Sequence, residues 1–372
     1  MIQIKGTQLI GKTESAEGKN TFKSFNPIEN TEFGPEFHEV TSQEISEAVQ
    51  LAEKAFLLYR KFSEKKRADF LLEITNILEE NSTELIPLCM KESALPKARL
   101  EGELMRTTNQ IRMFAEYIQQ KEWNEYSLDE TEPNRQPAPK PKLERKLIAL
   151  GPVAVFGASN FPLAFSVAGG DTASALAAGC SVVVKANPAH PGTSEFVSRC
   201  ILQAIENTNM PDGVFSLIQG QSHETGTNLV THPGIQAVGF TGSQKGGTAL
   251  FKAGMNREVP IPVFAEMGST NTIFILPEII QQNTKELTEG IYNSVTLGTG
   301  QFCTNPGLIF ISKKGAYEDF LNALNTEFSK PYSSTMLTPN ICKNYVEKSE
   351  NLVTVKGVRS LQTRFNENNT AA

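Results

Sequence analysis

The sequence predicts an α/β protein built around a parallel sheet. From residue 146 onward, short apolar runs of strand length alternate with longer stretches that have helical periodicity. Alternation of strands and helices at this spacing is typical of βαβ units, in which neighbouring strands run parallel. Polar and glycine-rich residues follow several of the apolar runs, and ligands of such sheets bind beyond the carboxyl ends of the strands. The chain has 372 residues, which is long enough for two domains with separate cores.

The first 130 residues are expected to form short extended segments and then three amphipathic helices. Residues 1–40 contain turn residues and few periodic signals. Thr41 and Glu44 then form a capping-box pattern, which marks the start of a helix. Apolar residues at helical spacing follow within 45–56, 70–78 and 100–114. We expect these helices to pack on the sheet, and no catalytic chemistry is visible in them.

A linker separates the helices from the alternating region. Residues 131–141 contain four prolines, which favour an extended backbone. The mixed charges of residues 142–146 indicate a solvated edge. Residues 151–184 carry a single charge, Asp171, but polar and glycine residues interrupt the apolar stretches throughout. No apolar run is long enough to cross a membrane, so we interpret this region as a buried α/β core.

The alternating region defines the predicted elements of the sheet. Strands are expected at 153–156, 181–185, 214–218, 235–240 and 261–265. Helices are expected from about 163 to 178, near 193–205, and after Ser243. Each predicted strand end is therefore a candidate position for ligand-binding residues.

Four of these strand ends carry chemically useful residues. They are the turn with Asn160, the segment with Lys185 and Pro188, the turn from Phe240 through Gly242 and Ser243 to Gly247, and the group Glu266, Met267 and Gly268. Glycines and a hydroxyl at a helix N-terminus favour an anion site, because unsatisfied N–H groups and the helix dipole point outward there. Taken singly, each cluster is ordinary turn chemistry, and no G-x-G-x-x-G fingerprint is present.

The segment around Cys303 differs from a structural cysteine site. It has a glycine-rich approach from Gly298 to Gly300 and an Asn305–Pro306–Gly307 exit, so its backbone is permissive. Most free cysteines are small buried hydrophobes, whereas the glycines around Cys303 predict an exposed thiol. The five cysteines are widely spaced and lack CxxC pairs, which argues against a disulfide framework or a metal site and fits a reducing cytosol.

Composition narrows the classes of partner. The net charge of −6 argues against nucleic-acid binding, which needs a clustered basic surface. The N-terminal residues have no apolar core of a signal peptide. We therefore expect a cytoplasmic protein that binds neither nucleic acid nor membranes and acts on a small molecule.

The motifs taken together resemble the aldehyde dehydrogenase superfamily. The matching segments, in the order of that family, are Asn160 to Pro162, Val183 to Lys185, Phe240 to Ser243, Glu266 to Gly268, and Gly300 to Cys303. The residues of several motifs are similar to those of one branch of the family, the 2,5-dioxovalerate (α-ketoglutarate semialdehyde) dehydrogenases. The resemblance implies a parallel-sheet NAD(P)-binding domain (1–130 and 147–265), a linker and oligomerisation segment (131–146), an α/β catalytic domain (266–372), and homo-oligomers among full-length relatives.

The resemblance also implies a mechanism for an aldehyde substrate. Cys303 would attack the carbonyl as a thiolate and form a thiohemiacetal. The side chain of Asn160 and the backbone N–H of Cys303 would stabilise the oxyanion. After hydride transfer to the nicotinamide, Glu266 would activate the water that hydrolyses the thioester.

Cofactor residues follow from the same resemblance. Lys185 corresponds to the lysine that reaches the adenosine ribose, and Gly242, Ser243 and Gly247 correspond to the pyrophosphate turn, with Phe240 and Gly268 beside it. The family's usual glutamate three residues after the lysine is Pro188 here. A glutamate at this position would repel the 2′-phosphate of NADP. Because Pro188 removes this repulsion, we expect NADP to be tolerated or preferred over NAD.

The chain departs from the family pattern after Cys303. Members of the branch continue much further, and the later Glu-x-Phe-Gly-Pro motif does not occur in this sequence. We therefore expect an interrupted chain with an incomplete catalytic domain, and exposed apolar surface that lowers stability or promotes aggregation. One alternative is an inactive remnant that at most binds nucleotide. Another is a Cys–His hydrolase, which is disfavoured because the four histidines (His38, His190, His223 and His232) lie in no dyad context.

Overall fold

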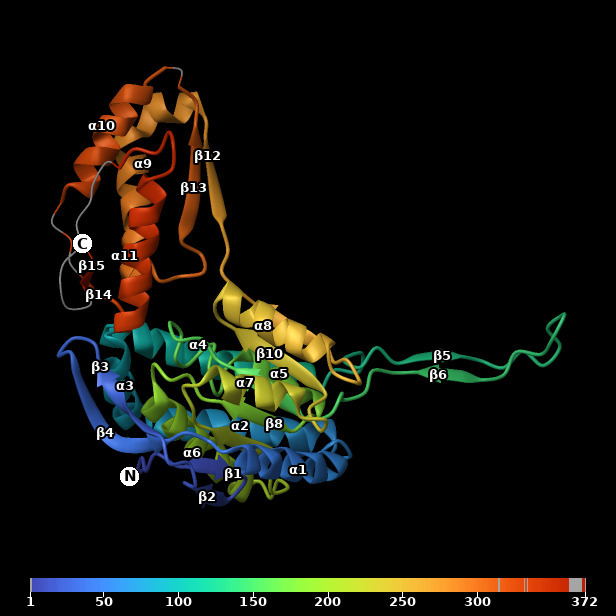
Figure 1. Ribbon diagram of the computed structural model, residues 1–372. Helices are drawn as coiled ribbons and strands as arrows, with labels where there is room; N and C mark the ends of the chain where they lie inside the picture. The colour runs from blue at the N-terminus through green and yellow to red at the C-terminus, as the bar shows by residue number, and fades with distance from the viewer. Residues whose placement is uncertain (1, 314, 331, 333, 361–369, 372) are drawn as a thin grey trace.

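The computed structural model describes residues 2–313, 315–330, 332, 334–360 and 370–371. These residues form two lobes and a projecting arm (Figure 1). The larger lobe surrounds a seven-stranded sheet, and the smaller lobe contains the residues that follow this sheet. The arm is an antiparallel hairpin of β5 (Ser127–Asp129) and β6 (Leu143–Arg145). It includes the predicted linker, whose role in oligomerisation stays a prediction.

The large sheet confirms the predicted α/β class. Its strand order is β11-β10-β7-β8-β9-β1-β2, and the first five of these strands run parallel. The parallel strands are β7 (Val153–Phe156), β8 (Val182–Lys185), β9 (Phe215–Ile218), β10 (Ala237–Thr241) and β11 (Val263–Glu266). The antiparallel edge consists of β1 (Gln8–Ile10) and β2 (Thr13–Ser15). Each parallel strand lies within two residues of its predicted bounds.

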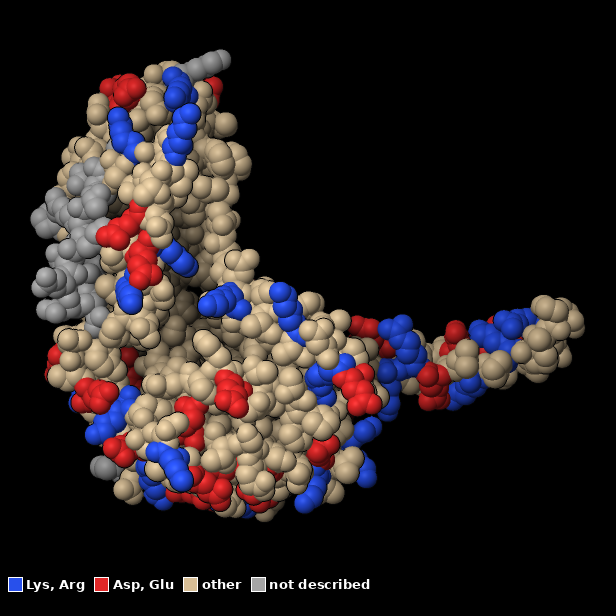
Figure 2. All heavy atoms as spheres, viewed as in Figure 1, with Lys and Arg blue, Asp and Glu red and all other residues tan. Residues whose placement is uncertain are grey.

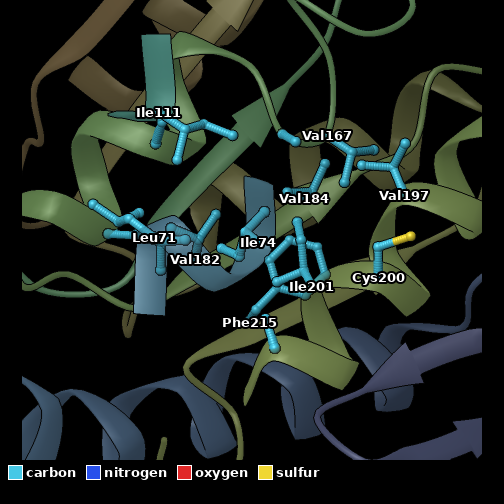
Figure 3. Close-up of a cluster of buried hydrophobic side chains, with 14 of the residues drawn as sticks. Leu71, Ile74, Ile111, Val167, Val182, Val184, Val197, Cys200, Ile201 and Phe215 are labelled. Carbon is cyan, nitrogen blue, oxygen red and sulfur yellow. The ribbon is translucent and has the colours of Figure 1, made fainter. Parts of the chain in front are cut away.

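Alternate residues of the central strands β7, β8 and β9 supply the two cores of the larger lobe. Val182 and Val184 of β8 belong to a cluster with residues of α2 (Glu64–Glu80), α4 (Lys97–Tyr117) and α6 (Pro191–Asn207) (Figure 3). Val183 points to the other face, where it belongs to a cluster with α1 (Ser42–Tyr59), α7 (His223–Thr231) and α8 (Gln244–Met255). Because both faces of the sheet are buried at β7 and β8, these two strands have continuous apolar sequences, apart from Lys185 at the end of β8.

The N-terminal helices largely follow the predicted pattern. Both hydrogen bonds of the Thr41–Glu44 capping box are present at the start of α1, and α4 begins directly after Pro96. A helix that was not predicted, α3 (Ser82–Ser93), contains Pro87. Before these helices, β3 (Thr21–Asn26) and β4 (Thr31–His38) form an antiparallel hairpin.

The predicted helix from 163 to 178 is wrong in its first half, because α5 (Gly170–Ala178) begins seven residues later. The backbone N–H groups of Leu163 and Ala164 donate to the buried carboxylate of Glu103 at 2.9 and 3.0 Å. These contacts hold the chain after β7 in a non-helical turn.

The smaller lobe is a second α/β unit. Its strands β12 (Asn271–Ile275) and β13 (Pro306–Ile311) are parallel. Its helices are α9 (Pro277–Thr296), α10 (Tyr317–Phe328) and α11 (Pro339–Val353), and a short pair is formed by β14 (Ser334–Thr335) and β15 (Thr370–Ala371). A buried cluster that includes Ile275, Ile280 and Phe320 joins the sheet to α9 and α10.

One face of the β12–β13 pair is exposed and apolar. Phe274 is 73% exposed and Phe310 is 51% exposed, and their rings stack with centroids 5.1 Å apart. The surface beside these strands carries few charges, whereas acidic and basic side chains are interspersed over the visible larger lobe (Figure 2). The expected exposure of apolar surface is therefore present, and its effect on aggregation stays a prediction. Within the described residues, no helix has the length and apolar character that a bilayer span requires.

Candidate active site

A cavity of about 760 Å³ lies beyond the carboxyl ends of β7, β10 and β11. Six of the nine residues predicted to form the site line this cavity: Asn160, Gly242, Ser243, Glu266, Gly268 and Cys303. The other three, Lys185, Phe240 and Gly247, are not among its lining residues. Residues from both lobes therefore meet at one place, although they are up to 143 positions apart in the sequence.

Three consecutive left-handed residues shape the approach to Cys303. The φ angles of Gly298, Thr299 and Gly300 are +57°, +60° and +70°. A Cβ atom on Gly298 would lie 2.2 Å from the ring of Phe302, so this position requires glycine for space as well as for φ. The tight turn leaves the side chain of Cys303 exposed at the cavity.

Side chains that sequence reasoning missed fix the backbone of Cys303. Its carbonyl accepts hydrogen bonds from the hydroxyl of Ser269 and from Nδ2 of Asn271, the latter at 2.7 Å. Asn271 also donates to the carbonyl of Asn305 at 3.0 Å, and Asn305 donates to the carbonyl of Val295 at 2.8 Å. The only sequence signal for these anchors was their position next to the Glu266 and Cys303 motifs.

The buried cysteines have a different environment. Cys89, Cys180 and Cys200 are buried, and burial raises the pKa of each thiol, to about 12 for Cys200. Such thiols remain protonated near neutral pH and are poor nucleophiles. Cys303 is exposed and Cys342 is half-buried, so Cys303 is the most accessible of the five thiols.

Asn160 lies against the loop that precedes Cys303. Its Nδ2 donates to the carbonyl of Gln301 at 2.6 Å. Two further hydrogen bonds fix the turn that carries Asn160. Nδ2 of Asn187 donates to the Gly157 carbonyl at 2.9 Å. Nε2 of buried His190 donates to the Ala158 carbonyl at 3.0 Å. Asn160 also lines the cavity, and a side-chain amide carries two N–H donors, of which this hydrogen bond uses one.

Glu266 ends β11, where it pairs in register with Thr241 of β10. Its carbonyl accepts the N–H of Gly242 at 3.0 Å, which ties the Glu266 segment to the glycine turn. Its side chain is exposed and lines the cavity. A Cβ atom on Gly268 would meet no atom within 4 Å, so the cavity is open at this residue.

The glycine turn positions the N-terminus of α8 at the cavity. Ser243 is the N-cap, and its hydroxyl accepts the N–H of Gly246 at 3.2 Å. Phe240 and Gly247 pack behind this turn: a Cβ on Gly242 would lie 2.7 Å from the Phe240 ring, and one on Gly247 would lie 2.7 Å from Met267. These two residues therefore support the turn and do not line the cavity.

Lys185 lies at the end of β8 and is half-buried. Burial lowers its pKa to about 8, and the charge of Glu39 opposes this shift. The Glu39 carboxylate is itself fixed by the N–H groups of Gln221 (2.7 Å) and Ser222 (3.0 Å). Lys185 is therefore an ammonium at pH 7 that loses its proton more readily than an ordinary lysine.

Several cavity residues had no signal in the sequence. They are Gln110 and Phe114 of α4, Asp171 of α5, and Leu337 and Ile341 from the end of the chain. Burial raises the pKa of the Asp171 carboxyl. No group of three potential metal ligands occurs within the described part of the chain.

Comparison with known proteins identifies the family. The model of the aldehyde dehydrogenase family matches residues 13–357. The alpha-ketoglutaric semialdehyde dehydrogenase of Acinetobacter baylyi is 41% identical over 361 residues, which cover 97% of this chain and 68% of that protein. Alpha-ketoglutaric semialdehyde dehydrogenase 2 of Azospirillum brasilense is 42% identical, covering 97% of this chain and 69% of its own length.

Solved structures agree at the level of the fold. An NADP-dependent glyceraldehyde-3-phosphate dehydrogenase of Bacillus halodurans superposes with a TM-score of 0.83 at 19% identity, covering 99% of this chain and 75% of that one. An NAD-dependent benzaldehyde dehydrogenase of Corynebacterium glutamicum gives 0.80 at 20% identity, covering 98% and 78%. The chain therefore belongs to the aldehyde dehydrogenase family of enzymes.

Proposed function

We propose that this enzyme oxidises an aldehyde to a carboxylic acid with NAD⁺ or NADP⁺, and that its substrate is 2,5-dioxovalerate. The observation that carries the reaction is that Cys303, Asn160 and Glu266 line a single cavity. The names of the two relatives at 41% and 42% identity support the choice of substrate.

The first half of the proposed reaction uses Cys303 and Asn160. The thiolate of Cys303 adds to the aldehyde carbon, and the carbonyl oxygen becomes an oxyanion. The free N–H of Asn160, whose other N–H donates to Gln301, and the backbone N–H of Cys303 stabilise that charge. When bound, NAD(P)⁺ would supply the hydride acceptor, and loss of a hydride from the thiohemiacetal carbon would leave a thioester on Cys303.

The second half uses Glu266. A carboxylate at the cavity removes a proton from water, and the resulting hydroxide attacks the thioester carbonyl. The carboxylic acid leaves and the Cys303 thiolate is regenerated. The exposure of Glu266 allows water to reach its carboxylate.

The residues around the cavity suit a dinucleotide. Ser243, the N-cap of the 12-residue helix α8, lines the cavity, and the positive end of the helix dipole at this N-terminus favours a pyrophosphate. The open space at Gly268 permits close approach of a ligand to the backbone. Lys185 offers an ammonium for a ribose or a 2′-phosphate.

The charges near Lys185 do not select between NAD⁺ and NADP⁺. Pro188 replaces the carboxylate that would repel a 2′-phosphate. However, Glu39 supplies another negative charge that acts on Lys185. We therefore retain both NAD⁺ and NADP⁺ as candidate cofactors.

The pKa of Lys185 gives a test of its role in cofactor binding. Because that pKa is about 8, the ammonium is present at pH 7 and mostly lost at pH 9. The affinity for NADP⁺ is expected to fall by about tenfold over this interval, in line with the change in the charged fraction. Calorimetric titration of the wild type and of Lys185→Met measures it, and a wild-type affinity as independent of pH as that of the variant would contradict the assignment.

The two alternatives make different demands on the site. A Cys–His hydrolase needs a histidine beside Cys303, but no histidine is among the described residues that line the cavity. His190 instead bonds to Ala158 and Ser194 on the far side of the turn. An inactive remnant that binds nucleotide predicts cofactor binding without turnover.

The substrate is tested by the initial rates of NAD(P)H formation with 2,5-dioxovalerate and with pentanal, which has the same chain length but no 2-oxo acid. We expect kcat/KM to be at least about tenfold higher for 2,5-dioxovalerate. Equal kcat/KM values for the two aldehydes would contradict the assignment of 2,5-dioxovalerate as the substrate but not the assignment of aldehyde oxidation as the reaction. A soluble protein that binds NADP⁺ but oxidises neither aldehyde would support the remnant.

A further inference from the structure

An aromatic residue is adjacent to each of the two residues proposed to act on the aldehyde carbonyl. Phe161 follows Asn160, and Phe302 precedes Cys303. The two rings meet edge to face with centroids 5.3 Å apart and planes at 79°. Phe161 belongs to the turn after β7, whereas Phe302 belongs to the loop that leads into β13. The ring pair therefore connects the Asn160 turn to the Cys303 loop.

One cation contacts both rings. The guanidinium carbon of Arg99 lies 4.4 Å from the Phe161 centroid and 5.0 Å from the Phe302 centroid. Both distances are within the range of a cation–π interaction. Nη2 of Arg99 is buried and has no hydrogen-bond partner among the described residues.

A buried carboxylate fixes the orientation of this guanidinium. Nη1 of Arg99 donates to Oε2 of Glu103 at 2.9 Å, one helical turn along α4, and the Glu103 side chain is fully buried. The other oxygen of Glu103 accepts the N–H groups of Leu163 and Ala164, just after the Asn160 turn. Glu103 thus holds the turn directly and holds Arg99 in the place where it meets both rings.

We propose that Arg99 is a positioning residue that sets the separation between the Asn160 amide and the Cys303 thiol. This inference rests on the proposed function, because it takes these two groups as the pair that acts on one carbonyl. The hydrogen bond from Asn160 to the Gln301 carbonyl is the second link between the same two segments. Arg99 contacts Phe161 beside Asn160 and Phe302 beside Cys303, so it joins the turn to the loop in addition to this hydrogen bond.

The planar shape of the guanidinium is essential to this role. A lysine at position 99 would keep the charge and the pairing with Glu103, but an ammonium is a compact point charge without a flat face to lie on two rings. The chain also offers a matched control. Arg106 lies 4.8 Å from the Phe165 ring and 5.9 Å from the Phe161 ring. Among the described residues it forms no cation–π interaction with Phe302 and no ion pair with Glu103, both of which Arg99 forms.

The test compares Arg99→Lys, Arg99→Met and Arg106→Met with the wild type. For Arg99→Lys we expect an unchanged melting temperature, a kcat roughly tenfold lower, and a KM for the cofactor within about twofold of wild type. Arg99→Met should lose the same rate and also melt roughly 5 °C lower, because Glu103 loses its charged partner. Arg106→Met should keep the wild-type kcat.

Hydrogen–deuterium exchange separates this inference from the proposed function, since it needs no turnover. The amides of residues 298–305 should exchange faster in Arg99→Lys than in wild type and Arg106→Met, while those of β8 stay unchanged. If the wild-type chain oxidises no aldehyde, the proposed function fails, and the exchange of residues 298–305 still decides whether Arg99 orders the loop. Wild-type exchange together with wild-type kcat in Arg99→Lys would overturn the inference, as would equal losses in Arg106→Met.

Discussion

Replacing Cys303 with alanine is expected to abolish aldehyde oxidation. The proposed reaction begins with attack by this thiol, and removal of a nucleophile costs roughly four orders of magnitude or more in kcat. The side chain is exposed, so the substitution leaves no cavity in the core and should not change the melting temperature. The measurement is NAD(P)H formation with 2,5-dioxovalerate, followed by absorbance.

Cys342→Ala is the matched control, because Cys342 is the other thiol that is not fully buried. It should retain the wild-type rate. Limited alkylation with iodoacetamide near neutral pH should modify Cys303 first, since burial raises the pKa values of Cys89, Cys180 and Cys200. A Cys303→Ala protein that keeps more than about one per cent of the wild-type rate would exclude the covalent mechanism.

Replacing Glu266 with glutamine should stop the reaction halfway. Glutamine has nearly the same shape but cannot accept a proton from water, and a general base contributes typically 10² to 10⁴ to a rate. Hydride transfer precedes the step assigned to Glu266, so it should still occur once. We expect a burst of about one NAD(P)H per active site, followed by a steady rate at least about a hundredfold lower than wild type.

Rapid mixing followed by mass spectrometry of the intact protein checks this expectation, because the thioester should accumulate on Cys303. Glu258→Gln is a suitable control, since Glu258 is exposed and does not line the cavity. A slow steady rate without a burst would place Glu266 before hydride transfer. An undiminished steady rate would remove it from the mechanism.

The sequence predicts those parts of the fold that local patterns determine. The bounds of β7, the capping box of α1 and the start of α4 follow from apolar runs, a Thr–Glu spacing and a proline. The turn after β7 was not predictable in this way. Its local sequence is compatible with a helix, and the carboxylate of Glu103, some 60 residues earlier, decides otherwise.

In the candidate site, too, local patterns were predictable and contacts between distant segments were not. Motifs at strand ends located the residues that line the cavity, because parallel strands place their carboxyl ends together. The motif did not distinguish the residue that lines the cavity, Gly242, from Phe240 and Gly247, which support the turn, because all three belong to one short segment. Contributions from α4 and from Leu337 and Ile341 depend on contacts between distant segments, and no local pattern records such contacts.

The anchor of Asn160 has a consequence for how the site tolerates sequence change. Its partner at 2.6 Å is the main-chain carbonyl of residue 301, which every amino acid carries. Substitutions of the Gln301 side chain that leave the backbone in place therefore preserve the anchor. The donor end has no such freedom: Asn160→Asp would put a carboxylate oxygen against a carbonyl oxygen, and the two would repel. The contact therefore tolerates substitutions at position 301 but not the loss of the amide at position 160.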